Sequence, residues 1–204
     1  MNKIFNPQSF NGPALRSILQ IIQSPTLIIP SLSIQDINHL NLTDLHKIGI
    51  KGVILDKDNT ITAPYSLQIH PRVKNALLRL QSSFPNHAIL SNSAGTPDDI
   101  HFNEAIEIEK NLGIRVIRHL EKKPSGLQET LNHFQLEKHE LAVVGDRLLT
   151  DVVFGNLHGM YTIHVQILTL ENDNPMARLA RSIENTFLLP FVSKWFIDRR
   201  EGRR

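Results

Sequence analysis

The chain has 204 residues, of which 41% are hydrophobic and 21% are charged, a composition typical of one folded domain rather than of a disordered chain. The absence of cysteine excludes a disulfide framework, a thiolate zinc site and a cysteine nucleophile. The net charge of +2 is small but unevenly placed, since residues 1–35 contain no acid and basic side chains outnumber acidic ones in residues 194–204. Such ends suit an anionic partner, either membrane lipid or nucleic acid, or they are solvated tails.

The first predicted element is an amphipathic helix over residues 13–23, with Leu15, Ile18, Leu19 and Ile22 on one face. This face can pack on the core of the same chain, on another subunit or on a membrane. Pro25 and Pro30 interrupt the longest uncharged run, so no stretch is suited to spanning a bilayer. The acid-free, Ser- and Gln-rich composition favours an organelle transit signal or an interfacial segment over a secretory signal.

Residues 31–50 are interpreted as a connecting region with a short helix, after which strands and helices alternate. The predicted strands are short, apolar and mostly β-branched: Gly52–Leu55, His87–Leu90, Ile114–Ile117, Leu141–Val144 and Tyr161–Val165. The predicted helices between them are Pro71–Gln81, Pro97–Leu112, Ser125–Phe134 and a short one from Thr150. This alternation predicts an α/β fold, a Rossmann-like three-layer sandwich with a central parallel sheet.

Polar side chains follow four consecutive predicted strands. They are Asp56 and Asp58 after the first, Ser91 and Asn92 after the second, Lys122 and Lys123 after the third, and Asp146, Arg147 and Asp151 after the fourth. Ligands of open α/β sheets bind beyond the carboxyl ends of the strands, so these side chains are expected to meet. Strand alternation directs Asp56 and Asp58 to one side and Lys57 away from it.

The chemistry that needs such a set is the transfer of a phosphoryl group to a carboxylate. Asp56 is the candidate nucleophile, forming an aspartyl-phosphate, and Asp58 is the candidate general acid and base. Asp56, Asp146 and the carbonyl of Asp58 are expected to bind Mg²⁺. The phosphate is expected to contact Ser91, Asn92 and Lys123, with Asp151 and Arg147 in supporting roles.

The stretches "DKDNT", "ILSNS", "KKP" and "GDRLLTD" resemble, in order, the four motifs of the haloacid-dehalogenase-like phosphatases, and "GDxxTD" is similar to their class IIIA branch. The resemblance covers about residues 47–170 and implies the fold of that family. One departure is Asn59, where many family members have glycine. Because asparagine tolerates a positive φ, the tight turn is expected to survive.

Several of these residues also have plainer interpretations. Ser91 could cap a turn instead of binding phosphate, and Arg147 could pair with a surface acid. Lys123 is preferred to Lys122 because the lysine of the family commonly precedes a proline directly. The ten histidines show no metal-ligand spacing and are interpreted as solvated residues or residues at the edge of the core.

The short segments between the motifs leave no room for a cap domain, which predicts an uncapped, open site. An open site favours a substrate whose bulk stays outside it, such as a lipid head group, a protein side chain or a nucleic-acid end. The stretches "GVILDKDNTIT" and "LSNSAGT" look like the fungal and plant mitochondrial phosphatidylglycerophosphate phosphatases. This resemblance implies release of phosphate from phosphatidylglycerophosphate, a phospholipid substrate, in a step towards cardiolipin.

The implied location is the matrix side of the mitochondrial inner membrane, with the enzyme bound peripherally to anionic lipid. The expected organisation is an N-terminal amphipathic arm over residues 1–46, a phosphatase core over 47–170 and a basic amphipathic extension over 171–204. In that extension Trp195 and Phe196 are expected at the lipid interface, with Lys194, Arg199 and Arg200 attracting anionic lipid. The sequence leaves room for a homo-oligomer.

Two enzymatic alternatives are a phosphatase for nucleic-acid ends and one for phosphoproteins. No interleaved aromatic platform for stacking bases is present, so no nucleic-acid partner is expected. A non-enzymatic alternative is a phosphorylatable receiver-like switch, which has no need of an acid and base such as Asp58 two residues after its phosphorylated aspartate. The complete set of site residues weighs against an inactive scaffold.

Overall fold

The continuously apolar runs of the sequence form the middle layer of the protein. In the computed structural model, which describes residues 20, 21, 23–169, 186, 188, 190 and 194, they build a five-stranded sheet in the order β1-β5-β4-β2-β3. All four pairings between these strands are parallel. The strands are β1 Leu32–Ile34, β2 Gly52–Leu55, β3 Asn86–Ile89, β4 Leu141–Gly145 and β5 Tyr161–Val165. The predicted α/β fold is confirmed.

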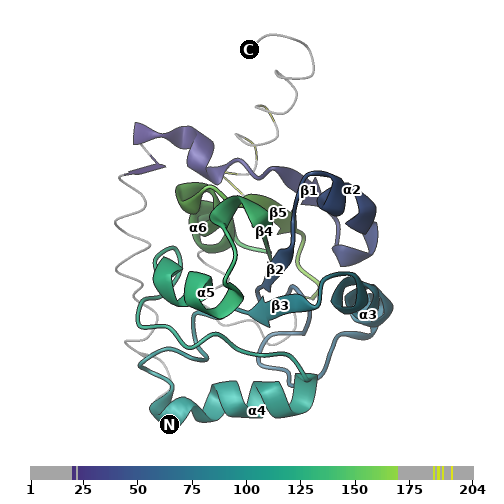
Figure 1. Ribbon diagram of the computed structural model, residues 1–204, viewed down its shortest axis with the longest axis vertical. Coiled ribbons are helices and arrows are strands. Elements are labelled where there is room, and N and C mark those ends of the chain that lie inside the picture. The colour runs from purple at the N-terminus through teal and green to yellow at the C-terminus, as the bar shows by residue number, and fades with distance from the viewer. Residues whose placement is uncertain are drawn as a thin grey trace.

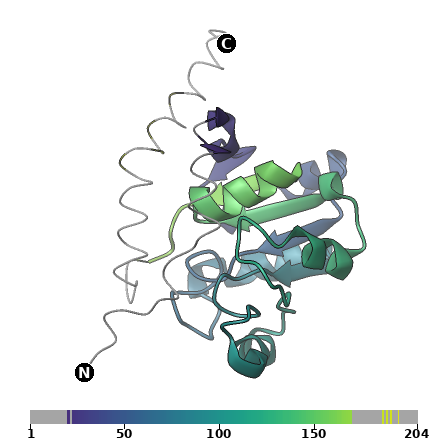
Figure 2. The same cartoon turned by 90° about the vertical axis from the view of Figure 1, so that its left-hand side faces the viewer.

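Helices cover both faces of this sheet (Figure 1; Figure 2). The α-helices are α2 Leu42–Lys47, α3 Lys74–Ser83, α4 Asn103–Leu112, α5 Leu127–Phe134 and α6 Val153–His158. Shorter helical turns are Pro25–Ile28, Ile37–His39, Pro71–Val73, Ile100–Phe102, Lys138–Glu140 and the π-helical turn Leu148–Val152. Among the described residues, no helix is long and apolar enough to cross a membrane.

Side-chain alternation along the buried strands divides the core into two main layers. Val53 and Leu55 of β2 pack in the cluster that includes residues of α2, α3 and α4. Ile54 packs on the opposite face with Phe134 of α5 and Phe154 of α6. Because β2 and β4 are covered on both faces, their sequences are continuously apolar instead of alternating.

Two predictions about the sheet were wrong. Residues 31–50 were expected to be a connection with a short helix, but they include β1, whose residues Leu32–Ile34 pair with Ile163–Val165 of β5. Residues 114–117 were expected to be a strand, but the structure has only an isolated parallel bridge between Ile89 and Val116 there. Ile89 still donates to the Arg115 carbonyl at 2.8 Å, so this segment lies along the β3 edge.

The helix predicted from Pro97 begins at Asn103, after the short turn Ile100–Phe102. The reason is Asp99, whose buried carboxylate accepts hydrogen bonds from the backbone amides of Gly95, Glu104 and Ala105 at 2.9 to 3.0 Å. These bonds use Asp99 to shape the loop before the helix. The other predicted helices agree with the structure within a few residues at their ends.

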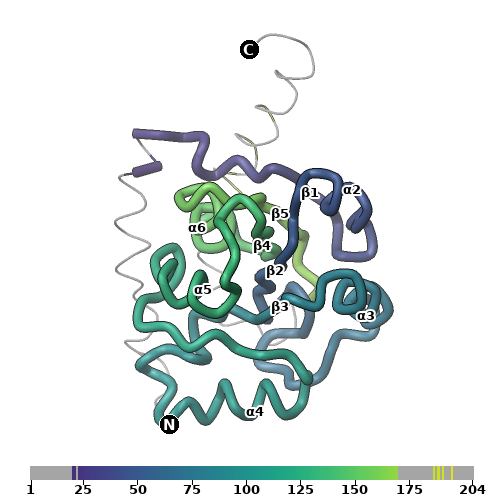
Figure 3. The backbone as a smooth tube through the Cα atoms, in the orientation of Figure 1, coloured from purple at the N-terminus to yellow at the C-terminus, as the bar shows by residue number. Residues whose placement is uncertain are grey.

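Most of the predicted helix over residues 13–23 and of the C-terminal extension over residues 171–204 lies outside the described residues. The three-part division of the chain stays a prediction. Within residues 23–169 the connections that follow β2 and β3 contain only short helical turns and loops before the next α-helix, as an uncapped site requires (Figure 3).

Candidate active site

Asp56, Asp146 and Asp151 lie together beyond the carboxyl ends of β2 and β4. These strands are neighbours in register, with Leu55 opposite Val144, and the Asp56 amide continues the ladder to the Val144 carbonyl at 2.8 Å. Each of the three aspartates offers one carboxylate oxygen, and these oxygens lie within 4.8 Å of one another. Clustered carboxylate oxygens fit a hard divalent cation such as Mg²⁺.

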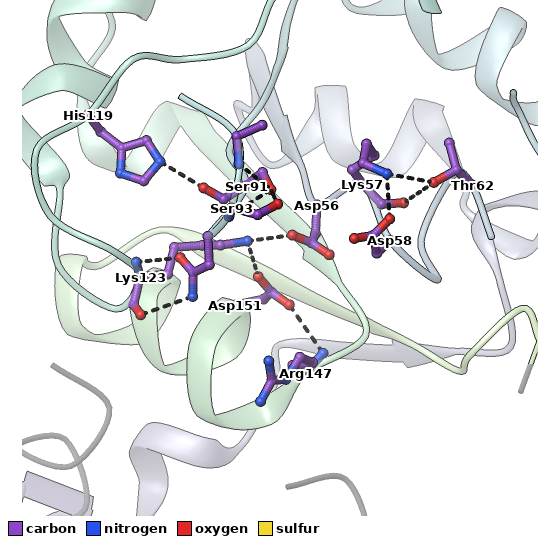
Figure 4. Close-up of polar contacts among 12 residues, drawn as sticks. Asp56, Lys57, Asp58, Thr62, Ser91, Ser93, His119, Lys123, Arg147 and Asp151 are labelled. Carbon is purple, nitrogen blue, oxygen red and sulfur yellow. Dashed lines mark hydrogen bonds and ion pairs between the residues drawn. The ribbon is translucent and has the colours of Figure 1, made fainter. Parts of the chain in front are cut away.

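Lys123 neutralises part of this cluster. Its Nζ donates to Asp56 at 2.7 Å and to Asp151 at 2.5 Å (Figure 4). The side chain is 2% exposed. Burial by itself lowers the pKa of Lys123, but the carboxylates of Asp151 and Asp56 outweigh burial and raise that pKa above its ordinary value. A permanently charged ammonium therefore lies beside the Asp56 carboxylate.

Asp151 is held in place by the turn that follows β4. Its second carboxylate oxygen accepts a hydrogen bond from the Arg147 amide at 3.1 Å. Gly145 provides the necessary space, because a β-carbon there would lie 2.3 Å from the Asp151 carboxyl carbon. Asp151 therefore contacts Lys123 through one carboxylate oxygen and the backbone through the other.

Asp58 lies in the turn after β2, beside Asp56 but outside the three-carboxylate cluster. Its carboxylate accepts a hydrogen bond from the Tyr65 amide at 3.1 Å and forms an ion pair with Lys57. Burial raises the pKa of the Asp58 carboxyl above its ordinary value, against the lowering effect of Lys57. A raised pKa suits a group that must carry a proton for part of its cycle.

Strand alternation gave the wrong direction for Lys57. The side chain is buried and lies beside Asp58 (Figure 4). Its ammonium also donates to the Ser66 carbonyl at 3.2 Å. The chain turns at Lys57, whose carbonyl accepts hydrogen bonds from the amides of Ile61 and Thr62, so alternation no longer applies. In the same turn Asn59 has a φ of 61°, as expected for the residue that replaces glycine.

Ser91 and Asn92 organise the loop after β3. The Ser91 hydroxyl accepts hydrogen bonds from the amides of Ser93 and Ala94 at 3.2 and 3.4 Å, which is the turn-capping alternative. The Asn92 side chain accepts from the Lys123 amide at 2.7 Å and donates to the Lys123 carbonyl at 3.3 Å. Asn92 therefore fixes the backbone that presents Lys123.

His119 is a structural contact that the sequence analysis did not single out. The buried ring lies between two backbone carbonyls, that of Ser91 at 2.8 Å and that of Glu121 at 2.6 Å (Figure 4). It joins the loop of Ser91 to the loop of Lys123. No residue spacing could have identified it, because its partner Ser91 is 28 positions away in the chain.

The structure separates the two candidate lysines. Lys123 lies inside the cluster, whereas Lys122 forms an ion pair with Asp98 at 2.7 Å at the edge of the site. Arg147 contributes its backbone amide to Asp151. Together the residues provide a carboxylate at a strand end, a neighbouring carboxyl group with a raised pKa, a fixed positive charge and clustered carboxylate oxygens. This arrangement can support phosphoryl transfer.

Comparisons with known proteins agree with this chemistry. Residues 13–167 match the family model described as mitochondrial PGP phosphatase. The chloroplastic phosphatidylglycerophosphate phosphatase 1 of Chlamydomonas reinhardtii is 39% identical over 92% of this chain and 70% of its own length. The chloroplastic and mitochondrial counterpart of Arabidopsis thaliana is 36% identical over 87% of this chain, which spans about half, 52%, of that protein.

The mitochondrial phosphatidylglycerophosphatase of Saccharomyces cerevisiae is 36% identical over 82% of this chain and 93% of its own length. No solved structure matches the chain. The family match over residues 13–167 includes the four stretches that contain the site, so this comparison and the geometry concern the same part of the molecule.

Proposed function

This chain belongs to the family of mitochondrial PGP phosphatases, and on that premise we propose that it hydrolyses phosphatidylglycerophosphate to phosphatidylglycerol and inorganic phosphate. The observation that carries the proposal is the buried Lys123 ammonium between the carboxylates of Asp56 and Asp151. A phosphate dianion repels a carboxylate nucleophile, and a fixed positive charge beside that nucleophile offsets the repulsion.

In the first step, a carboxylate oxygen of Asp56 attacks phosphorus as the bond from phosphorus to the ester oxygen breaks. Asp58 gives its proton to the departing glycerol oxygen, so that a neutral alcohol leaves. The raised pKa of Asp58 supports this role, because the carboxyl group retains a proton to higher pH than an ordinary aspartate. The product of the step is an aspartyl-phosphate on Asp56.

In the second step, water attacks the phosphorus of the aspartyl-phosphate and Asp58, now a carboxylate, accepts a proton from that water. The bond between phosphorus and the Asp56 oxygen breaks, which releases inorganic phosphate and restores both carboxyl groups to their starting states. Because Asp58 acts first as the acid and then as the base, its carboxyl group must reach both the departing glycerol oxygen and the attacking water oxygen from one position.

We assign a Mg²⁺ ion to Asp56, Asp146 and Asp151, with the Asp58 carbonyl as the further ligand expected from the sequence. When bound, this cation neutralises charge on the phosphate and on the carboxylates around it. Lys123 and the Ser91 hydroxyl are assigned to the phosphate oxygens. Asn92 and Arg147 are assigned positioning roles through the Lys123 backbone and the Asp151 carboxylate.

The test is phosphate release from phosphatidylglycerophosphate in mixed micelles, measured beside a 5′-phosphorylated oligonucleotide, a phosphopeptide and an aryl phosphate. We expect the highest kcat/KM for the lipid, loss of all release in EDTA and recovery with Mg²⁺. Turnover of the aryl phosphate without preference for the lipid would support the phosphatase mechanism but contradict phosphatidylglycerophosphate as the substrate. Full activity in EDTA would reject the metal assignment.

Gly145→Ala should misplace Asp151, because the new β-carbon would lie 2.3 Å from its carboxyl group. We expect kcat on the aryl phosphate to fall about 10- to 100-fold, since Asp151 holds Lys123 against Asp56. The matched control is Gly155→Ala, whose β-carbon would clash equally with Thr162, at 2.3 Å, without touching Asp151. Equal losses of kcat in both variants would contradict a positioning role for Asp151.

We also propose a mitochondrial location, because the family and the yeast relative are described as mitochondrial. Within the mitochondrion we propose peripheral attachment on the matrix side of the inner membrane. The Chlamydomonas relative is described as chloroplastic, so organelle fractionation is the direct test. Protease protection in isolated mitochondria and mitoplasts distinguishes the matrix from the intermembrane space. Carbonate extraction distinguishes peripheral attachment from integration.

A further inference from the structure

Four large apolar side chains are exposed on the loops that surround the candidate active site. Tyr65 is 64% exposed, Ile100 71%, Phe102 40% and Leu120 77%, and we call these four residues the apolar rim. Tyr65 follows β2, Ile100 and Phe102 follow β3, and Leu120 follows the segment that bridges to β3 at Val116. Since these segments run parallel, all four residues lie on the side of the sheet where the strands have their carboxyl ends, as do Asp56 and Lys123.

Hydrogen bonds and ion pairs connect the apolar rim to the site and the loops of the rim to one another. The Tyr65 amide donates to Asp58, and Leu120 is three residues before Lys123. The loops of Ile100 and Leu120 are joined by the hydrogen bond from the His119 amide to the Gly95 carbonyl at 2.8 Å. The Lys122–Asp98 ion pair and the Arg118 guanidinium, 5.7 Å from the Phe102 ring centroid, join the same two loops.

The backbone is strained at two places in the rim. Tyr65 has a φ of 61° and Phe102 a φ of 58°, and His101 between the exposed Ile100 and Phe102 has a φ of 57°. Large L-residues rarely adopt this conformation, which glycine or asparagine adopts at lower cost. Burial cannot account for the strain at Tyr65, because its side chain remains mostly exposed. Strain of this kind is concentrated at functional sites, where side chains must point in set directions.

We propose that the apolar rim enters the surface of an anionic phospholipid bilayer, so that the active site opens directly onto lipid head groups. The proposal rests on the proposed lipid substrate, whose phosphate is attached to acyl chains that stay in the bilayer. To bring that phosphate to Asp56, the edge of the site must reach the interface. Tyrosine and phenylalanine side chains favour the interface between head groups and acyl chains, and isoleucine and leucine side chains are stabilised by burial among the acyl chains.

The form of the surface favours lipid over a protein partner. The rim consists of separate apolar side chains on the loops that also carry Asp58 and Lys123, which suits a charged head group surrounded by hydrocarbon. The net charge of +2 and the pI near 9.0 are compatible with an anionic bilayer. The rim also differs from the membrane segments expected at the chain ends, because it orients the active site as well as attaching the protein.

The absence of cysteine from the whole chain allows a direct test. Ile100→Cys and Leu120→Cys, each labelled with an environment-sensitive nitrobenzoxadiazole dye, are mixed with vesicles of phosphatidylcholine and phosphatidylglycerol. Ile48→Cys is the matched control. Ile48 is 53% exposed but precedes β2, so it lies on the side of the sheet where the strands have their amino ends. We expect emission to shift to shorter wavelength at positions 100 and 120 and to stay unchanged at position 48.

An unchanged emission at positions 100 and 120, or equal shifts at all three positions, would overturn the proposal. A shift that depends on protein concentration and needs no lipid would also overturn it and assign the surface to a second copy of the chain. Because the fluorescence needs no turnover, it reports on the rim even when phosphatidylglycerophosphate is not hydrolysed. The proposal that the apolar rim enters the bilayer and the proposal that the substrate is phosphatidylglycerophosphate can therefore be rejected independently.

A kinetic arm uses the double variant Ile100→Asp with Leu120→Asp. Charged side chains oppose entry into the interface, so hydrolysis of vesicle-borne phosphatidylglycerophosphate should fall at least about tenfold. Hydrolysis of a soluble aryl phosphate should stay unchanged, and Ile48→Asp should leave both rates unchanged. Equal losses on the soluble and vesicle-borne substrates would contradict an interfacial role.

Discussion

Asp56→Asn is expected to lower the rate of phosphate release by at least about 10⁴-fold, because an amide cannot act as the nucleophile that forms the aspartyl-phosphate. The fold should be retained. Asparagine has nearly the same shape, the backbone bond from residue 56 to Val144 is unaffected, and Lys123 keeps its ion pair with Asp151. The measurements are kcat on aryl phosphate and on phosphatidylglycerophosphate, with thermal unfolding of both proteins.

The control for this substitution is Asp98→Asn, another aspartate near the site whose partner is Lys122 at its edge. Its kcat on the aryl phosphate should stay within about threefold of the wild type, as expected of a surface ion pair. A hydroxylamine-sensitive phosphoprotein should be trapped with the wild type and be absent with Asp56→Asn. Trapping of the same adduct on the variant would show that another residue is the nucleophile.

The sequence was most informative where a strand is covered on both faces. The runs that form β2 and β4 are continuously apolar, whereas β5 also contains the buried Thr162 and His164. The predicted bounds of all three strands agree with the structure within one residue. β1 was missed because it has three residues, with the exposed Ser33 in the middle, and pairs only with β5. Residues 114–117 contain three buried apolar residues and the exposed Arg115. They lie at the edge of the sheet beside β3 and form one bridge, which composition alone does not reveal.

The same distinction holds within the candidate site. Side chains that directly follow strands, such as Asp56 and Asp146, could be placed together because parallel strands end at one edge. The contacts of Asn92 and His119 could not be predicted, because each spans about 30 residues between two loops. The direction of Lys57 was predicted wrongly for a local reason, since the rule of strand alternation was applied two residues beyond the end of β2.

Lys123→Met should impair both activity and stability, because Lys123 is a fully buried charge with two carboxylate partners. Methionine nearly conserves the volume and removes the ammonium, so Asp56 and Asp151 are left facing each other without compensation. We expect kcat to fall about 10²- to 10³-fold, the cost of losing one preorganised electrostatic group. The free energy of unfolding should fall by about 3 to 5 kcal/mol, as when one partner of a buried ion pair is removed.

The double variant Lys123→Met with Asp151→Asn separates these two effects. Removing the uncompensated carboxylate should restore much of the lost stability, measured by urea unfolding in EDTA, while kcat on the aryl phosphate stays low. The reason is that stability depends on balancing buried charge, whereas catalysis depends on having a positive charge beside Asp56. Recovery of kcat together with stability in the double variant would mean that Lys123 serves the fold alone. If Lys123→Met alone were as stable as the wild type, Lys123 would not be buried as a charged group.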